Sequence, residues 1–252
     1  MKQVAMLFVF ILLITWLAPP AAAQGASPVN GEVRLDVRGS GGQQTYSAPI
    51  QILLFLTVLT FIPAIIISLT SFTRIIIVFH FLRQALGTSE TPSNQIMIGL
   101  TLFLTLFIMA PVGEQINKDA LQPMMEGKIS QTEALSSAVK PLRGFMLKYT
   151  REKDLALFLS IAKKERPKTA ADIPTTVMIP AFMISELKTS FQIGFVLFLP
   201  FLVIDMVVAT VLLSMGMMQL PPVMVSIPFK ILLFIMVDGW NLVVGSLVKS
   251  FY

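Results

Sequence analysis

Two apolar stretches of this chain exceed the length that a bilayer requires, and both carry charged residues. The first, Ile50 to Phe81, is longer than the roughly 20 residues that span a membrane, and Pro63 and Arg74 interrupt it. The second stretch begins near Val177. A charged side chain that faces lipid costs about 2.5 kcal/mol or more, so these side chains should face protein or water. We therefore expect kinked or broken helices rather than straight spans.

The composition also indicates a membrane protein. Hydrophobic residues make up 55% of the chain and charged residues 13%, with a mean hydropathy of +0.78. This balance leaves too little polar surface for a soluble globule, so the chain should be membrane-embedded or packed against apolar subunits. Cysteine is absent, which excludes disulfides and thiolate metal sites. Most Lys and Arg lie between Lys118 and Lys168 among acidic residues, so nucleic-acid binding is not expected.

The first 49 residues are predicted to contain a signal peptide and a tail. Residues 1–23 combine a basic start, an apolar run from Val4 to Leu17 and three alanines, which predicts cleavage before Gln24. An uncleaved anchor helix is the alternative, but the apolar run is short for a span. Residues 24–49 are rich in Gly, Ser and Gln and should form a flexible exported tail.

The rest of the pattern predicts an all-α fold. Residues 50–112 and residues 177–252 each form a long, kinked helical hairpin, and residues 113–176 form an amphipathic helical insertion between them. Within the insertion, Ser130 and Glu133 have the Ser-x-x-Glu spacing of a capping box, which marks the start of a helix.

The distribution of Lys and Arg conflicts with a simple membrane topology in which each hairpin crosses the bilayer twice. An exported amino terminus places the insertion outside as well, although it holds about eleven of the 19 Lys and Arg residues. The positive-inside rule favours the opposite side, though it weakens for loops of this length. We therefore do not expect four plain transmembrane helices.

A methionine-rich segment joins the two arms of the second hairpin. This methionine joint comprises Met215, Gly216, Met217, Met218, Gln219, Leu220, Pro221 and Pro222. Glycine and two prolines predict a helix break, and clustered thioethers make a deformable apolar surface. A single methionine is more often a core or lipid-facing residue than part of a gate. The interpretation as a gate therefore depends on the clustering of the methionines at a helix break that two prolines mark.

Six charged residues lie inside or at the edges of the apolar runs: Arg74, Glu186, Lys188, Asp205, Lys230 and Asp238. Two interpretations are open, namely ion pairs that fix the register of helices or subunits, and groups that line an ion path. We favour the structural interpretation for Asp205 and Lys230. The sequence lacks the metalloprotease, nucleophile-elbow, Walker A and dinucleotide motifs, so neither an enzyme nor a cofactor or metal site is expected.

A series of longer motifs follows one another in a fixed order over about four-fifths of the chain, from Ile50 onward. They read SFTRI at 71–75, LRQALGT at 82–88, PAFMISELKTSFQIGF at 180–195, PFLVID at 200–205, IPFK at 227–230, VDGW at 237–240 and GSL at 245–247. Together with the methionine joint, they closely resemble the FliP/SctR family of type III secretion export-gate proteins.

Two positions depart from the family pattern. Gln219 stands where the family has a further methionine in the joint, which questions whether a purely apolar seal forms here. Ser93 replaces the second proline of the turn after Leu82, which should reduce only its rigidity.

The resemblance implies a subunit of an export channel. Several copies, in the family a pentamer, would join FliQ-type and FliR-type subunits and other export-apparatus membrane proteins in a helical ring surrounded by membrane lipid. The ring would pass unfolded flagellar subunits across the bacterial inner membrane, in the flagellar basal body. Met215, Met217, Met218 and Gln219 would line the pore and close it as a gasket.

The resemblance also assigns roles to residues away from the joint. It implies pairing between subunits for Glu186, Asp205 and Lys230, and packing between neighbouring copies for Phe145 and Phe158. Because the chain lacks a nucleotide site, energy would come from other parts of the machine.

Three other functions are compatible with the sequence. An ion- or proton-coupled transporter would use Arg74, Asp205, Lys230 and Asp238, and a chaperone-like assembly scaffold would conduct nothing. The third is an export-gate homologue of a virulence injectisome, although the signal peptide and the motif around Lys230 favour a flagellar machine.

Overall fold

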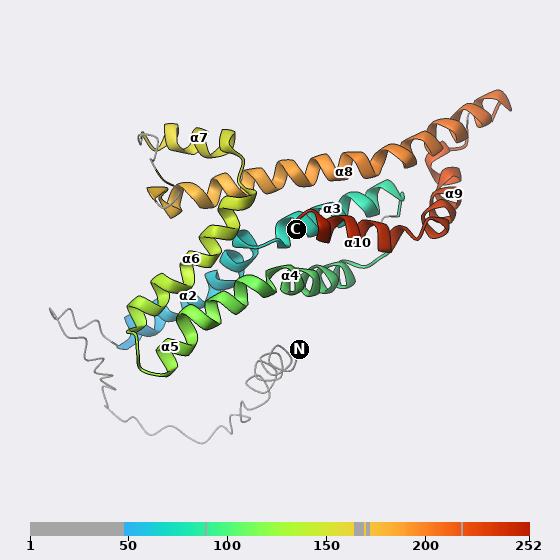
Figure 1. Ribbon diagram of the computed structural model, residues 1–252. Helices are drawn as coiled ribbons and strands as arrows, with labels where there is room; N and C mark the ends of the chain where they lie inside the picture. Colours follow the sequence, from blue (N-terminus) through green and yellow to red (C-terminus); the bar gives the residue numbers. More distant parts are fainter. Residues whose placement is uncertain (1–47, 89, 164–168, 170–171, 218) are drawn as a thin grey trace, which may run out of the picture. The chain divides into compact units, whose positions relative to one another are not determined.

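The computed structural model describes residues 48–88, 90–163, 169, 172–217 and 219–252, and all regular structure within them is helical (Figure 1). The predicted all-α class is therefore confirmed for these residues. Residues 58–252 form one unit, within which all packing described below lies. The predicted signal peptide and nearly all of the predicted tail lie outside the described residues.

The first apolar stretch consists of two helices, α2 (Ala48–Leu69) and α3 (Phe72–Ala85), and the axis bends by 71° between them. Hydroxyl side chains near the break bond to the backbone. Ser68 Oγ donates to the Ala64 carbonyl at 2.7 Å, and Thr73 Oγ1 donates to the Ile67 carbonyl at 3.2 Å. Such bonds compete with helical hydrogen bonds, which explains why the helix ends inside an apolar sequence.

Helix α4 (Asn94–Ile116) continues through a π-helical turn, η1 (Asn117–Leu121), into α5 (Gln122–Met125). The predicted boundary between residues 112 and 113 therefore falls within a continuous helical segment. The sequence changes from apolar to polar at this point, but none of the polar residues breaks the helix. The change from apolar to polar residues therefore indicates a change in the surroundings of the helix, not the end of the helix.

The insertion forms α6 (Gln131–Tyr149) and α7 (Glu152–Ile161). The predicted capping box at the start of α6 is confirmed. The Glu133 backbone N–H donates to Ser130 Oγ at 3.3 Å, and the Ser130 backbone N–H donates to Glu133 Oε2 at 2.9 Å. These two bonds satisfy amide groups that the first helical turn leaves unpaired.

The second apolar stretch forms α8 (Thr175–Ser214), α9 (Pro222–Met236) and α10 (Gly239–Lys249). Helix α8 has 40 residues, so it is about 60 Å long, twice the roughly 30 Å of a hydrocarbon core. Helices α9 and α10 are bent by 65°, and Asp238 between them has a left-handed backbone with φ of 50°.

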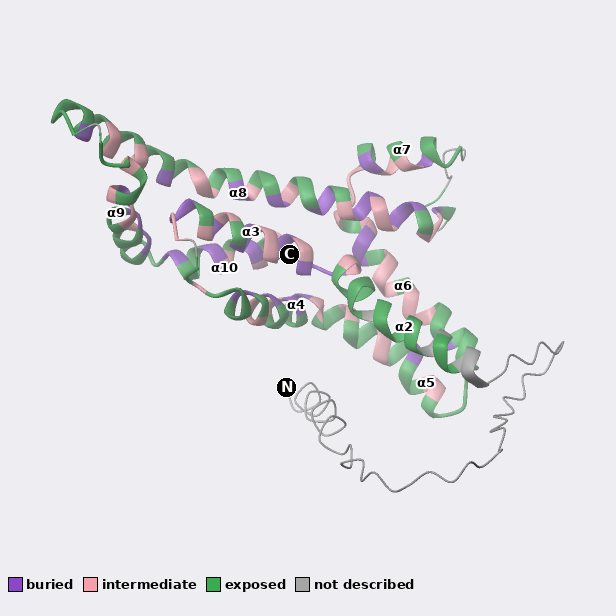
Figure 2. Ribbon diagram, turned by 180° about the vertical axis from the view of Figure 1, so that it is seen from behind, coloured by how far each residue is buried: buried purple, intermediate pink, exposed green. Residues whose placement is uncertain are grey.

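Helix α3 lies at the centre of the hydrophobic core, where it packs on α8 and α4. Figure 2 shows buried residues along α3 and the first half of α8, and mostly exposed residues towards the end of α8 and on α9. The core side chains include Ile75, Val78, Phe79 and Leu82 of α3, Met146 of α6, Met178 and Phe182 of α8, and Leu247 of α10.

Large apolar side chains remain exposed on the outer faces of three helices. Representative ones are Phe103 and Phe107 on α4, Phe195, Val203 and Met206 on α8, and Phe229 and Ile235 on α9. By length and composition, residues 94–125 and α8 could each cross a membrane, and up to four spans result if each bent pair counts as one. These faces require lipid or apolar protein around them. The arrangement into kinked hairpins and a ring stays a prediction.

A tight contact between α3 and α8, at Gly194, gives a stability prediction. A Cβ atom added at Gly194 would lie 2.5 Å from the Phe81 ring, whereas one added at Gly99 on α4 would meet no atom within 4 Å. We expect Gly194→Ala to lower the free energy of unfolding by about 1–3 kcal/mol because the ring must move. Gly99→Ala should be neutral or stabilising. Thermal unfolding of both purified variants in detergent checks this, and equal midpoints would contradict the packing.

Candidate functional site

The methionine joint begins with a glycine-dependent helix end. Gly216 has a φ of +73°, its backbone N–H donates to the Leu213 carbonyl, and the next N–H, of Met217, donates to the Leu212 carbonyl, both at 3.0 Å. This pair of bonds is the Schellman motif, which requires a left-handed residue that glycine adopts without strain. The glycine between the methionines therefore ends α8 and reverses the chain.

The methionine side chains project from this turn into solvent. Met215 is 67% exposed and Met217 is 43% exposed, and Gln219 is exposed as well. Pro222, the first residue of α9, needs no helical N–H partner, so the second arm starts directly after the turn. Met218 lies outside the described residues. One copy of the chain leaves these apolar groups uncovered.

An apolar hollow of about 430 Å³ lies between the two arms below the joint. Its walls are formed by valines of α8, including Val207 and Val211, and by Val225 and Phe229 of α9. The end of the α8–α9 pair is therefore hollowed as well as apolar.

A partly buried ion pair joins α8 to α9. Lys230 is 2% exposed, and its Nζ lies 2.7 Å from Asp205 Oδ2. Ser226 Oγ donates to the other carboxylate oxygen of Asp205 at 2.5 Å. The pair thus has a partner for each charge within the chain, whereas the family resemblance implied pairing between subunits.

A second ion pair joins α3 to α8 and is fully buried. Arg74 Nε donates to Glu186 Oε2 at 2.8 Å, and Arg74 Nη2 donates to Glu186 Oε1 at 2.5 Å. The two side chains are 3% and 0% exposed. A two-pronged contact of this kind fixes the relative rotation and register of the helices. Here, too, Glu186 finds its partner within the chain.

The third nitrogen of the Arg74 guanidinium forms hydrogen bonds with the segment that follows α10. Nη1 donates to the carbonyl and the hydroxyl of Ser250 at 3.1 and 3.0 Å, and the guanidinium lies 3.9 Å from the centroid of the Phe251 ring. The Tyr149 hydroxyl of α6 donates to the Phe251 carbonyl. Four segments of the chain therefore meet at one buried cation.

The remaining predicted residues lie in different surroundings. Phe145 is 9% exposed and contacts the rings of Phe182 and Phe251. Phe158 is half-buried against the core, and Asp238 is exposed at the bend between α9 and α10. Packing of the two phenylalanines between copies stays a prediction.

Sequence reasoning missed a polar cluster that joins α7 to α8. Ser185 Oγ donates to Asp154 Oδ2 at 2.6 Å, and the Arg151 side chain donates to the same oxygen at 2.7 and 2.9 Å. The Arg151 backbone N–H also donates to Ser185 Oγ at 3.0 Å. Burial raises the pKa of Asp154, but the hydrogen bonds from Ser185 and Arg151 and the charges of Arg151 and Lys188 outweigh it, so the pKa is lowered.

Two of the contacts that sequence reasoning missed involve residues whose spacing in the sequence could have revealed them. Arg151 and Asp154 have the three-residue spacing of a helical ion pair, and Ser226 lies one turn before Lys230 on the same face of α9. No spacing pattern could have revealed the contact of Ser250, because its partner Arg74 is far away in the sequence.

These features define an all-helical, membrane-associated subunit with exposed apolar faces and internally paired charges. A family model described as the FliP family matches residues 55–247. The flagellar biosynthetic protein FliP of Bacillus subtilis (strain 168) is 57% identical over 217 residues, which cover 86% of this chain and 98% of the relative.

Two other relatives agree. The flagellar biosynthetic protein FliP of Pectobacterium carotovorum subsp. carotovorum is 51% identical over 84% of this chain and 82% of its own length. The protein of the same name in Aquifex aeolicus (strain VF5) is 51% identical over 80% of this chain and 85% of its own length. The chain belongs to the FliP family. This is not a family of enzymes.

The lowered pKa of Asp154 predicts how stability depends on pH. The ionised carboxylate stabilises the folded state fully above its ordinary pKa of 3.8, and this contribution disappears as the pH falls through the lower folded value. We expect Asp154→Asn to be less stable than the wild type near neutral pH, and the difference to shrink in acid. Thermal unfolding midpoints between neutral and strongly acidic pH check this.

Glu152→Gln provides the matched control, because Glu152 is an exposed acid on the same helix. A difference between wild type and Asp154→Asn that is constant at all pH values, or equal to that of the control, would contradict the assignment.

Proposed function

We propose that the chain is a pore-forming core component of the flagellar type III protein export gate. In this role, several copies surround a channel in the bacterial inner membrane, at the flagellar basal body, through which unfolded flagellar subunits pass. Membership of the FliP family supports a role in flagellar protein export, since the relatives are named flagellar biosynthetic proteins.

The observation that best supports a pore is the exposure of the methionine joint. Met215 and Met217 project from a tight turn at the end of two apolar helices, away from the core. A single copy cannot shield these side chains, and several copies around one axis would shield them against each other. Because methionine is unbranched and polarizable, such a ring can exclude ions and still yield to a polypeptide.

Gln219 belongs to the same exposed turn. Its amide would hydrogen-bond water wherever it faced the pore, so it would make the proposed gasket more hydrated than one of methionine alone. We include Gln219 in the gasket together with Met215, Met217 and Met218.

The buried charges favour a gate over an ion-coupled transporter. Arg74 is held by Glu186, and Lys230 by Asp205, so each pair neutralises itself and fixes helix register. A transporter needs groups that exchange ions during the cycle, whereas these four groups bind one another across the helices. We therefore assign the four residues to structure. Asp238, which is exposed, remains available for contact with another subunit.

The proposed partners follow from the exposed surfaces and the family. Further copies of this chain, five in the proposed ring, together with FliQ-type and FliR-type subunits would cover the apolar faces that α8 and α9 leave open. Membrane lipid would cover the rest. The injectisome alternative is disfavoured because the relatives carry flagellar names.

Replacing the thioethers tests the gasket. We expect Met217→Ala combined with Met218→Ala to raise ion current through the reconstituted complex several-fold, because each alanine removes most of the apolar side chain that would block the pore. Electrical recording of the closed complex measures this. Export of flagellar subunits from cells carrying the variant shows whether the complex still assembles.

Met125→Ala is the control, since Met125 is 83% exposed in α5, outside the joint. It should leave the current unchanged. Normal assembly and export with wild-type current in the double variant would contradict the gasket, and a complex that never conducts would favour the scaffold alternative.

A further inference from the structure

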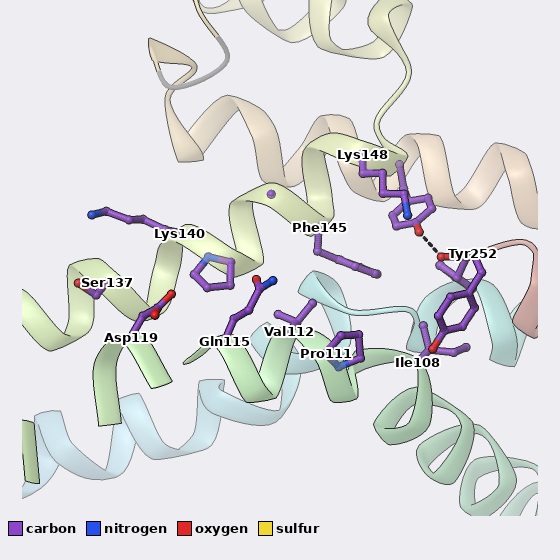
Figure 3. Close-up of a pocket in the computed structure, with 14 residues that line it drawn as sticks. Ile108, Pro111, Val112, Gln115, Asp119, Ser137, Lys140, Phe145, Lys148 and Tyr252 are labelled. Carbon is purple, nitrogen blue, oxygen red and sulfur yellow. Dashed lines mark hydrogen bonds between the residues drawn. The ribbon is translucent and has the colours of Figure 1, made fainter. Parts of the chain in front are cut away.

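A hollow of about 650 Å³ lies where α4 and η1 face α6 and the residues after α10. Figure 3 shows Asp119 and Lys140 towards one end of the hollow, and Lys148 and Tyr252 on the side of Ile108 towards the other. The floor includes the Phe145 ring. The hollow thus has polar groups at both ends.

One row of side chains on α4 and η1 extends beyond the hollow. Phe103, Phe107, Pro111, Gln115 and Asp119 follow at intervals of four residues, so each is the neighbour of the next in a row that slants around the helix. Phe103 is 66% exposed and Phe107 is 61% exposed. The row therefore leads from aromatic rings to an amide and a carboxylate where the apolar part of the span ends.

The charges that line the hollow are mainly positive. Lys140, Lys148 and a single acid, Asp119, line the hollow, and within the part of the chain that the structure describes neither lysine forms an ion pair. Lys148 lies over the Tyr149 ring, 5.1 Å from its centroid. A group with a negative charge and a long apolar portion complements the lysines of the hollow and the apolar row on α4.

We propose that this hollow binds one anionic phospholipid, with its phosphate beside Lys140 and an acyl chain along the row of Phe103, Phe107 and Pro111. The end of an apolar span lies at the membrane surface, where basic pockets attract anionic headgroups. A zwitterionic lipid offers the same apolar portion without net charge, so it should bind more weakly. The site does not depend on the export function, and it would be present in each copy of the chain.

Native mass spectrometry of the purified full-length chain tests the site with phosphatidylglycerol and phosphatidylcholine as probes. We expect the wild type to retain phosphatidylglycerol preferentially. Lys140→Gln should weaken retention about fivefold, the effect of one basic residue near a charged headgroup. Lys153→Gln removes the same charge from the exposed face of α7, outside the hollow, and should change nothing.

A second variant blocks the hollow without disturbing the fold. Gly144 lines the hollow, and a Cβ atom added there meets no atom within 4 Å, so the side chain of Gly144→Leu starts without a clash, and leucine favours the helix more than glycine. It should abolish specific retention, whereas Gly99→Leu, which adds the same bulk elsewhere on α4, should not.

Several results would overturn the proposal. These are equal retention of both lipids, unchanged retention in Gly144→Leu, displacement of the lipid by millimolar inorganic phosphate, and loss of oligomers in Gly144→Leu with lipid retention intact. The last result would assign the hollow to contact between copies.

Discussion

The buried guanidinium of Arg74 is the interaction on which the packing of residues 58–252 depends. It lies on the central helix α3 and holds Glu186 of α8 with two nitrogens and Ser250 with the third. In a low-dielectric core, removal of one partner leaves a charge uncompensated, at a cost of about 3–5 kcal/mol. The aromatic rings of Tyr149 and Phe251 enclose the same cation, so helices distant in the sequence are aligned at one point.

Residues 58–252 combine a core that is joined by buried contacts with an end that is hollowed and exposed. Around Arg74 the helices are joined by ion pairs and buried rings, whereas beyond the Lys230 and Asp205 pair the two arms enclose an apolar hollow and end in exposed methionines. This division suits the proposed gate, since a channel closure must deform while its frame does not. The Asp205 pair fixes the register of the arms and therefore the height at which the joint stands.

The sequence predicts elements whose causes are local. The methionine joint is found because glycine and proline mark a turn, and the start of α6 because Ser130 and Glu133 satisfy its first amides. The sequence does not show how far the helix runs, since polarity changes after Val112 while α4 continues to Ile116. The partner of Glu186 is also hidden, because Arg74 lies 112 residues away and a charge pattern does not show whether its partner belongs to the same copy.

In the proposed gate, the methionine joints of neighbouring copies meet around one axis. The chain has no native cysteine, so Met217→Cys introduces a single thiol into each copy of this chain. Disulfides form only when Cα atoms lie within about 7 Å, so mild oxidation of the assembled complex reports direct proximity. We predict covalent dimers for Met217→Cys, since one thiol per copy can link only two copies, and monomers for Met125→Cys in the same preparation. Monomers from both variants, in a complex of unchanged mass, would contradict the account.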